Sequence, residues 1–310
     1  MTERRGLEPT LKEHSENPEP QTDVLSARAE ERQTRQDTPS AAEEPLTREE
    51  RDHVSKNRRL SSLTVYSVVL KDGEEELDRP KTSLWWSGVA AGIAISSSVL
   101  AEGVIRSGLG ADHPYLHMIE SFGYSFGFVL VIMSRLQLFT ENTITVVLPV
   151  LAAPSRNNLY CSLRLWAIVF LANMVGTSLT AAIAVHGGVL PLEVLEAIVG
   201  ISREVAELDP GQTLLRGIPA GFLIAALVWM LPSARGTELF IIVMVTWLIA
   251  AGGFTHVVVG SNEIFTLVFS GELTVFSAFI HHILPTLIGN VFGGTGLFAM
   301  LAYGQISQEM

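Results

Sequence analysis

The chain has 310 residues, one cysteine and a net charge of −11, and its mean hydropathy is +0.34. Residues 1–82 carry 19 acidic and 14 basic side chains, whereas the other 228 positions carry 13 acidic side chains and seven arginines. A soluble domain of that length carries about a quarter charged residues, so the second part is predicted to be a membrane domain. The single cysteine excludes an internal disulfide and a thiolate metal cage. The chain also lacks the basic patch of a nucleic-acid-binding protein.

The first part is predicted to be an acidic, polar cytoplasmic tail over residues 1–82. Residues 1–55 are rich in Glu, Gln, Ser, Thr, Pro and Arg and have no apolar period, which is typical of a disordered segment. They lack a signal-peptide core and cleavage site, so the segment is expected to stay on the protein. The apolar stretch at residues 60–70 is too short to span a bilayer. It is predicted to be a short strand or an interfacial helix near the membrane.

The rest of the chain predicts six membrane spans, since each needs about 20 apolar residues. They are placed at residues 84–105, 116–150, 163–185, 212–231, 239–269 and 274–303. Six spans put both termini on one side, and the basic residues before Leu84 favour the cytoplasm. The membrane domain is therefore predicted at residues 83–305, followed by a short C-terminal tail at 306–310.

One further helix is predicted between the third and fourth spans. Residues 190–208 place apolar side chains at helical spacing with acidic side chains opposite. This pattern is typical of an amphipathic helix that lies on the membrane surface.

The second and fifth spans are too long for one simple helix, and polar residues interrupt each of them. The sequence RLQLFTENTITVVLP breaks at Thr140 to Asn142, and GGFTHVVVGSNEIFT breaks first at Thr255 and His256. Lipid cannot satisfy the backbone groups that a break frees. Both breaks are therefore expected to face protein or a water-filled path.

A matching motif follows each break and indicates an internal repeat. ANMVG contains Asn173, which lies 34 residues after Phe139, and GNVFGG contains Asn290, which lies 36 residues after Phe254. Two halves of three spans each must insert with opposite orientation. The predicted fold is therefore an all-α membrane protein with six transmembrane helices, built as two inverted three-helix repeats whose second and fifth helices are broken.

The motifs LFTENT, NMVG, GGFTH and GNVFGG resemble those of the formate/nitrite transporter family. The long tail and the stretch HVVVGSNE resemble its YfdC-type inner-membrane branch. The resemblance covers residues 80–305. It implies an aquaporin-like six-helix protomer, a homopentamer with one pore per protomer, and a multi-pass protein of the inner (plasma) membrane. It also implies passage of small monovalent anions such as formate or nitrite.

The resemblance also implies a set of pore residues. His256 is expected to be the central pore histidine and Thr140 its hydrogen-bonding neighbour. A weak acid crosses an apolar narrowing when its charge is neutralised, and an imidazole suits that purpose as a proton donor or hydrogen-bond partner. Two asparagines are expected to orient the breaks and two phenylalanines to form the narrowings: Asn173, Asn290, Phe139 and Phe254.

The chain departs from the family pattern in its charged residues. Glu141 stands where a small residue is common, and Glu263 adds an acid seven residues after His256. No lysine follows Lys81, although some relatives use one to draw anions to the pore. Arg135 is predicted to pair with Glu141 or Glu263, since an unpaired guanidinium in lipid is costly.

Other functions remain open from the sequence. A channel for water or a neutral solute such as glycerol is the nearest rival, although the paired NPA motifs of aquaporins are absent. A non-conducting sensor that signals through its tail is another. An enzyme is not predicted, because SGLGAD lies in a polar loop without an accompanying serine–histidine or paired-aspartate arrangement. No cofactor or metal site is predicted either, since the adjacent His281 and His282 point to different helix faces.

Overall fold

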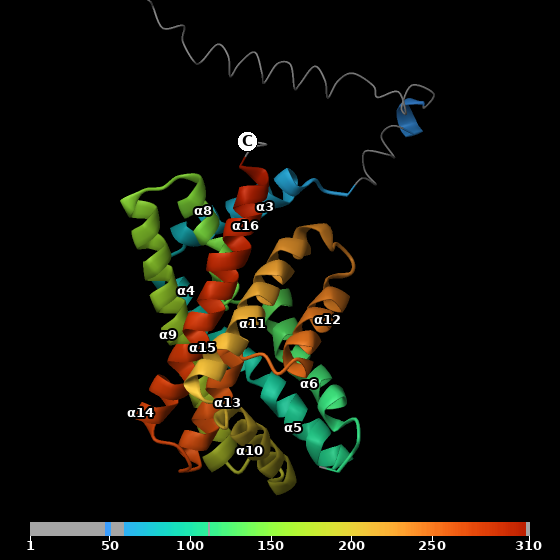
Figure 1. Cartoon of the computed structure of the whole chain (residues 1–310), viewed down its shortest axis with the longest axis vertical. Coiled ribbons are helices and arrows are strands. Elements are labelled where there is room, and N and C mark those ends of the chain that lie inside the picture. Colours follow the sequence, from blue (N-terminus) through green and yellow to red (C-terminus); the bar gives the residue numbers. More distant parts are fainter. Residues whose placement is uncertain (1–46, 51–58, 111, 308–310) are drawn as a thin grey trace, which may run out of the picture. The chain divides into compact units, whose positions relative to one another are not determined.

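The computed structural model describes residues 47–50, 59–110 and 112–307 (Figure 1). The contacts divide the chain into two units, Met1–Arg59 and Leu60–Met310. In the first unit the backbone N–H and the hydroxyl of Thr47 both donate to Glu50 Oε2 at 2.8 Å. Most of the predicted tail, residues 1–46 and 51–58, lies outside the described residues, as do residues 308–310.

The second unit begins with an amphipathic helix, α3 (Ser62–Asp78). Ser61 caps it, because its hydroxyl accepts a hydrogen bond from the Thr64 N–H at 3.2 Å. The helix packs against α8 (Val147–Ala152) and α16 (Met300–Ile306). One face is buried: Val65, Tyr66, Val69, Gly73 and Leu77. The segment predicted as a strand or helix is thus a helix, and it continues through the acidic residues that follow.

Within the described residues, five helical segments are long and apolar enough to cross a membrane. They are Lys81–Leu109, Leu116–Met133, Arg156–His186, Pro210–Ser233 and Val275–Ile306. The first comprises α4 (Lys81–Ile95) and α5 (Ser97–Leu109), and the next two are α6 (Leu116–Met133) and α9 (Arg156–His186). The fourth comprises α11 (Pro210–Met230) and the short turn η1 (Leu231–Ser233).

The last long segment changes its winding along its length. It runs through α14 (Val275–Ser277), η2 (Ala278–Ile283), α15 (Leu284–Val291), η3 (Phe292–Ala299) and α16. Both η2 and η3 are π-helical. Stretches of this kind are wider than an α-helix and occur often at functional sites.

The two spans predicted to be broken are both interrupted. After α6 the chain is non-helical until α7 (Asn142–Thr145), which α8 follows. In the same way α12 (Glu238–Ala251) and α13 (Val257–Phe269) are separated by a short irregular stretch. The helices α7 with α8, α12 and α13 are apolar but too short to span alone.

The predicted amphipathic helix is α10 (Leu192–Ala206). Its apolar face, which includes Val194, Ile198 and Ile201, is buried. It packs against α5 and α13. The predicted helix is therefore present, but its apolar face covers protein.

Glycines allow two pairs of helices to approach closely. Helix α4 packs on α9, and α11 packs on α15 and η3. A Cβ at Gly92 would collide with the Asn173 carbonyl oxygen, and a Cβ at Gly221 would collide with that of Asn290. Such small residues let backbones touch at helix crossings. Both asparagines are thus held against a neighbouring helix.

Candidate functional site at the two helix breaks

Each break begins with the same backbone geometry. The N–H of Leu136 and the N–H of Phe254 each donate to the carbonyl five residues back at 3.0 Å. The residue before each has a positive φ, 53° at Arg135 and 62° at Gly253. Glycine adopts this conformation freely, whereas a side chain such as that of arginine is strained there. The chain is therefore turned out of the helix in the same way at both positions.

Asn173 clamps the first break. Its Oδ1 accepts a hydrogen bond from the Phe139 N–H at 2.9 Å. Its Nδ2 donates to the carbonyl of Gly88 at 2.8 Å and to that of Gln137 at 2.9 Å. The side chain is fully buried. It therefore satisfies two of the backbone groups that the break removes from helical hydrogen bonding.

Asn290 clamps the second break with the same three kinds of hydrogen bond. Its Oδ1 accepts from the Val257 N–H at 2.8 Å, and its Nδ2 donates to the carbonyls of Gly217 and Thr255 at 2.9 Å each. These bonds match Phe139 with Val257. The sequence-based match of Phe139 with Phe254 was therefore wrong by three residues, because it followed the repeated Phe-Thr dipeptide rather than the asparagine bonds.

His256 and Thr140 meet where the two breaks come together. Nε2 of His256 lies 2.7 Å from Oγ1 of Thr140. Nδ1 accepts a hydrogen bond from the Val259 N–H at 3.3 Å and so caps α13. In a neutral ring the proton is then on Nε2, which donates to the threonine oxygen. His256 is only 2% exposed, and the edge of its ring faces Phe128 at a centroid distance of 5.0 Å.

Two cavities approach this pair from opposite ends of the unit. The first, the His256 cavity, has a volume of about 350 Å³ and is lined by residues of α5, α6, α10 and α13, among them His256. The second, the Leu138 cavity, has a volume of about 460 Å³ and is lined by residues of α3, α6 and the first break, among them Leu138. Figure 1 places α10 and α3 at opposite ends of this unit.

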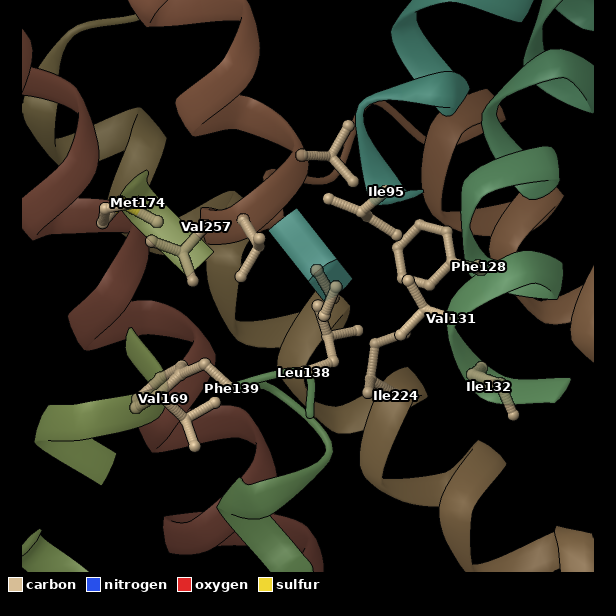
Figure 2. Close-up of a cluster of buried hydrophobic side chains, with 14 of the residues drawn as sticks. Ile95, Phe128, Val131, Ile132, Leu138, Phe139, Val169, Met174, Ile224 and Val257 are labelled. Carbon is tan, nitrogen blue, oxygen red and sulfur yellow. The ribbon is translucent and has the colours of Figure 1, made fainter. Parts of the chain in front are cut away.

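A fully buried apolar cluster, here called the apolar barrier, touches the linings of both cavities. Figure 2 shows Phe128, Val131, Leu138 and Ile224 gathered in one cluster, and all four are fully buried. Phe128 contacts the ring of His256, which lines the His256 cavity, and Leu138 lines the other cavity. A charged group would lose its hydration on crossing this barrier.

The two phenylalanines expected to form narrowings lie in different surroundings. Phe254 lines the His256 cavity. Phe139 lines neither cavity, and its ring packs against Phe170 at 5.3 Å and Trp166 at 5.8 Å on α9. These contacts favour a packing role for Phe139 over the expected narrowing. Consecutive residues of an extended segment point to opposite sides, so Leu138 faces the barrier and Phe139 the core.

The predicted pairing of Arg135 was also wrong. Its guanidinium lies 3.7 Å from Asp72 on α3, and no ion pair joins it to Glu141 or Glu263 in the part of the chain that the structure describes. The Arg135 side chain is 83% exposed because the left-handed turn after α6 directs it outward. Partial burial raises the pKa of the Asp72 carboxyl, and Arg135 acts in the opposite direction.

A charged network at the His256 cavity was not anticipated from the sequence. Arg106 donates from Nε and Nη2 to the two oxygens of Glu120, at 2.8 and 2.7 Å, and from Nη1 to Glu204 at 2.6 Å. Glu120 is only 4% exposed at its side chain. The signal in the sequence was the presence of charges inside apolar segments, since such residues are rare there and usually functional.

Together these features define an all-helical, multi-pass membrane protein whose broken helices meet between two cavities. A model of the formate/nitrite transporter family matches residues 63–304. The inner membrane protein YfdC of Escherichia coli (strain K12) is 41% identical over 249 residues, which is 80% of this chain and 80% of that protein. The chain belongs to the formate/nitrite transporter family, as its motifs indicated.

Two solved structures share the fold. A pentameric formate channel with formate bound has a TM-score of 0.63 and 19% identity, and the match covers 74% of this chain and 98% of that chain. An FNT family ion channel has a TM-score of 0.66 and 19% identity, with coverage of 79% and 98%.

Proposed function

We propose that the protein carries small monovalent anions of weak acids, of the formate and nitrite class, across the membrane. The observation that supports this most directly is the hydrogen bond between His256 and Thr140, which lies between two cavities and beside an apolar barrier. The Thr140 hydroxyl accepts from the imidazole, and its own proton has no acceptor among the described residues. It is therefore free to donate to an anion.

The proposed path requires the substrate to lose its charge. An anion that leaves the His256 cavity meets Phe128, Val131, Leu138 and Ile224. These side chains cannot replace its hydration. A carboxylate or nitrite that receives a hydrogen bond from the Thr140 hydroxyl, which His256 holds in place, and then a proton, becomes a neutral acid that such a barrier admits. Phe254, at the cavity, is proposed to narrow the path on the His256 side.

We further propose that the two halves form an inverted repeat. The matching bonds of Asn173 and Asn290, and the matching glycine contacts at Gly92 and Gly221, support this arrangement. It predicts six membrane spans and both termini on the cytoplasmic side of the inner membrane. The solved formate channel that shares this fold is pentameric. A homopentamer with one path per protomer is the proposed assembly, with lipid around it.

The large apolar side chains exposed on the outer helix faces are consistent with that assembly. They include Phe122, Phe126 and Met133 on α6 and Leu171, Val175 and Leu179 on α9. Such faces need cover from lipid or from a neighbouring subunit.

A channel for neutral solutes is the second candidate, and the acidic lining of both cavities favours it. The Leu138 cavity is lined by Asp72, Glu76, Glu141 and Glu238 against the single Arg135. The His256 cavity is lined by four glutamates and two arginines. Net negative walls repel free anions.

The deciding experiment measures flux into proteoliposomes of formate, nitrite, hydrosulfide, acetate and glycerol over a pH series. Wild type and His256→Phe are compared after size-exclusion chromatography has established equal assembly. Weak-acid flux that rises toward acid pH and changes in the variant supports the proposal. Flux of glycerol alone assigns the protein to neutral solutes, and no flux from assembled protein favours a non-conducting sensor.

A further inference from the structure

The His256 cavity contains two carboxylates without a partner. Glu102 on α5 is 7% exposed and Glu263 on α13 is 6% exposed, and both line the cavity together with His256. Among the described residues neither receives a hydrogen bond, and Glu102 Oε2 is a buried oxygen without a partner. A buried carboxylate is normally paired or hydrogen-bonded.

The nearby cation does not compensate these two groups. Arg106 lies one helical turn after Glu102, but its guanidinium already binds Glu120 and Glu204. One positive charge is thus shared by two other carboxylates. Arg216 also lines the cavity, and it is exposed rather than paired with the buried acids within the described chain.

We propose that Glu102 and Glu263 form a proton-holding pair that protonates the substrate anion before it enters the apolar barrier. Two buried carboxylates that line one cavity cannot both ionise at low cost, so the pair retains one proton. The inference rests on the proposed function and names the proton source for it. Nothing in the central histidine–threonine bond requires His256 itself to give up a proton, because its Nε2–H is already donated to Thr140.

The transfer is balanced without any redox step. The O–H bond of the protonated glutamic acid breaks, and an O–H bond forms on the carboxylate or nitrite oxygen of the substrate. The neutral acid crosses the barrier and leaves two glutamates ionised. A proton from the water of the His256 cavity then restores the pair. Each turnover therefore moves one proton with one anion.

The other charged and titratable groups that line the cavity influence whether this pair keeps its proton. Helix α5 contributes a cation, α6 and α10 contribute carboxylates and other groups, and α11, η2 and the second break contribute an arginine and two histidines. These groups are Arg106, His117, Glu120, Tyr124, Glu204, Arg216, His256 and His282. Helices α4 and α9 contribute no charged side chain to this lining. The acids outnumber the arginines, which favours retention of a proton.

The test compares formate uptake into proteoliposomes between pH 5 and pH 8 for wild type, Glu102→Gln, Glu263→Gln and the double variant. Glu196→Gln is the matched control, because Glu196 is an exposed acid on α10 and does not line the cavity. The double variant is expected to lose about a hundredfold of its uptake at neutral pH, the lower end of the range for proton transfer by a positioned side chain. It should retain uptake at pH 5, where the medium supplies formic acid, and the control should follow wild type.

Infrared difference spectroscopy of the assembled protein supplies a readout that does not depend on transport. A protonated carboxyl band at neutral pH that disappears in the double variant, but persists in Glu196→Gln, supports the pair. Unchanged uptake profiles in the double variant, or absence of that band from wild type, would overturn the proposal. If wild type carries no formate at any pH, the proposed function fails instead, and with it the donor role of the pair.

Discussion

Nε2 of His256 lies 2.7 Å from Oγ1 of Thr140, although 116 residues separate them in the chain. The two residues come from different breaks, and each break is held by its own asparagine. Their contact therefore depends on both halves of the protein at once. Any change that displaces either break is expected to alter this bond.

Thr140→Val removes the partner of His256 while keeping the shape of the side chain. Because the imidazole N–H is left without an acceptor in a buried site, the variant should lose about 1–3 kcal/mol of stability. Anion flux should fall together with its pH dependence. Thr246→Val is the control, since Thr246 is equally buried and its hydroxyl donates to the carbonyls of Ile242 and Val243 on its own helix. Equal flux in the two variants would contradict a substrate role for Thr140.

Asn173→Ala and Asn290→Ala should have closely similar effects, because the two side chains make matching sets of three hydrogen bonds. Each variant leaves buried backbone groups unpaired, at a cost of about 1–3 kcal/mol per group. Thermal unfolding in detergent measures the loss. Asn157→Ala, at an exposed position on α9, should unfold like wild type. A large loss for only one asparagine would argue against matched breaks.

Leu138→Ala and Phe139→Ala distinguish a residue that lines the proposed path from a residue that packs in the core. Leu138 belongs to the apolar barrier and lines a cavity, so its truncation should widen the path and raise the flux of acetate relative to formate. Phe139 packs against Trp166 and Phe170. Its truncation should cost about 3–5 kcal/mol of stability without changing that ratio. If instead Phe139→Ala changed the flux ratio and Leu138→Ala only lowered the stability, Phe139 would be the residue that narrows the path.

Arg106→Gln should destabilise the protein strongly. The substitution leaves the buried Glu120 carboxylate without its guanidinium, and breaking such a pair costs about 3–5 kcal/mol. The double variant with Glu120→Gln should recover much of the loss, since no buried charge then remains unpaired. Arg203→Gln is the control: its ion pair with Glu272 has the same 2.7 Å distance but is exposed, and its loss should leave unfolding unchanged.

Gly92→Ala should disturb the helix crossing that holds Asn173, because the added Cβ meets backbone atoms of α9 that cannot move aside. Overpacking of this kind costs about 1–3 kcal/mol. Gly108→Ala is the control, since no atom lies within 4 Å of its Cβ position. A helical alanine there should be neutral or slightly stabilising. Thermal unfolding of both variants measures the effect. A loss of stability in Gly92→Ala but not in Gly108→Ala shows that the close approach of α4 and α9, rather than any glycine substitution, is responsible.

The sequence predicted the breaks well and their register poorly. Polar residues within apolar spans, together with the two NxxG motifs, located both breaks, and the family resemblance supplied the roles expected for His256, Thr140 and both asparagines. The repeated Phe-Thr dipeptide then matched Phe139 with Phe254, whereas the asparagine bonds match Phe139 with Val257. A shared dipeptide shows only that two short stretches are alike. The hydrogen bonds from a distant helix decide which residue of the first break corresponds to which residue of the second.

The partners of charged residues could not be predicted from the sequence either. The sequence indicated that Arg135 needs a partner, but the positive φ at that residue turns its side chain outward to Asp72. The bonds of Arg106 to Glu120 on the next helix, α6, and to Glu204 on α10, 98 residues further along the chain, join three helices at one point. No spacing along the chain encodes such a contact.

By itself the sequence determined the membrane character, the two breaks and the family, because each follows from local composition or from short motifs. The tertiary structure decided that Leu138 rather than Phe139 faces the barrier, and that Glu102 and Glu263 share one cavity. The reason is physical. The side of an extended segment that faces a path is fixed by the hydrogen bonds that clamp its backbone, and these come from asparagines more than 30 residues away.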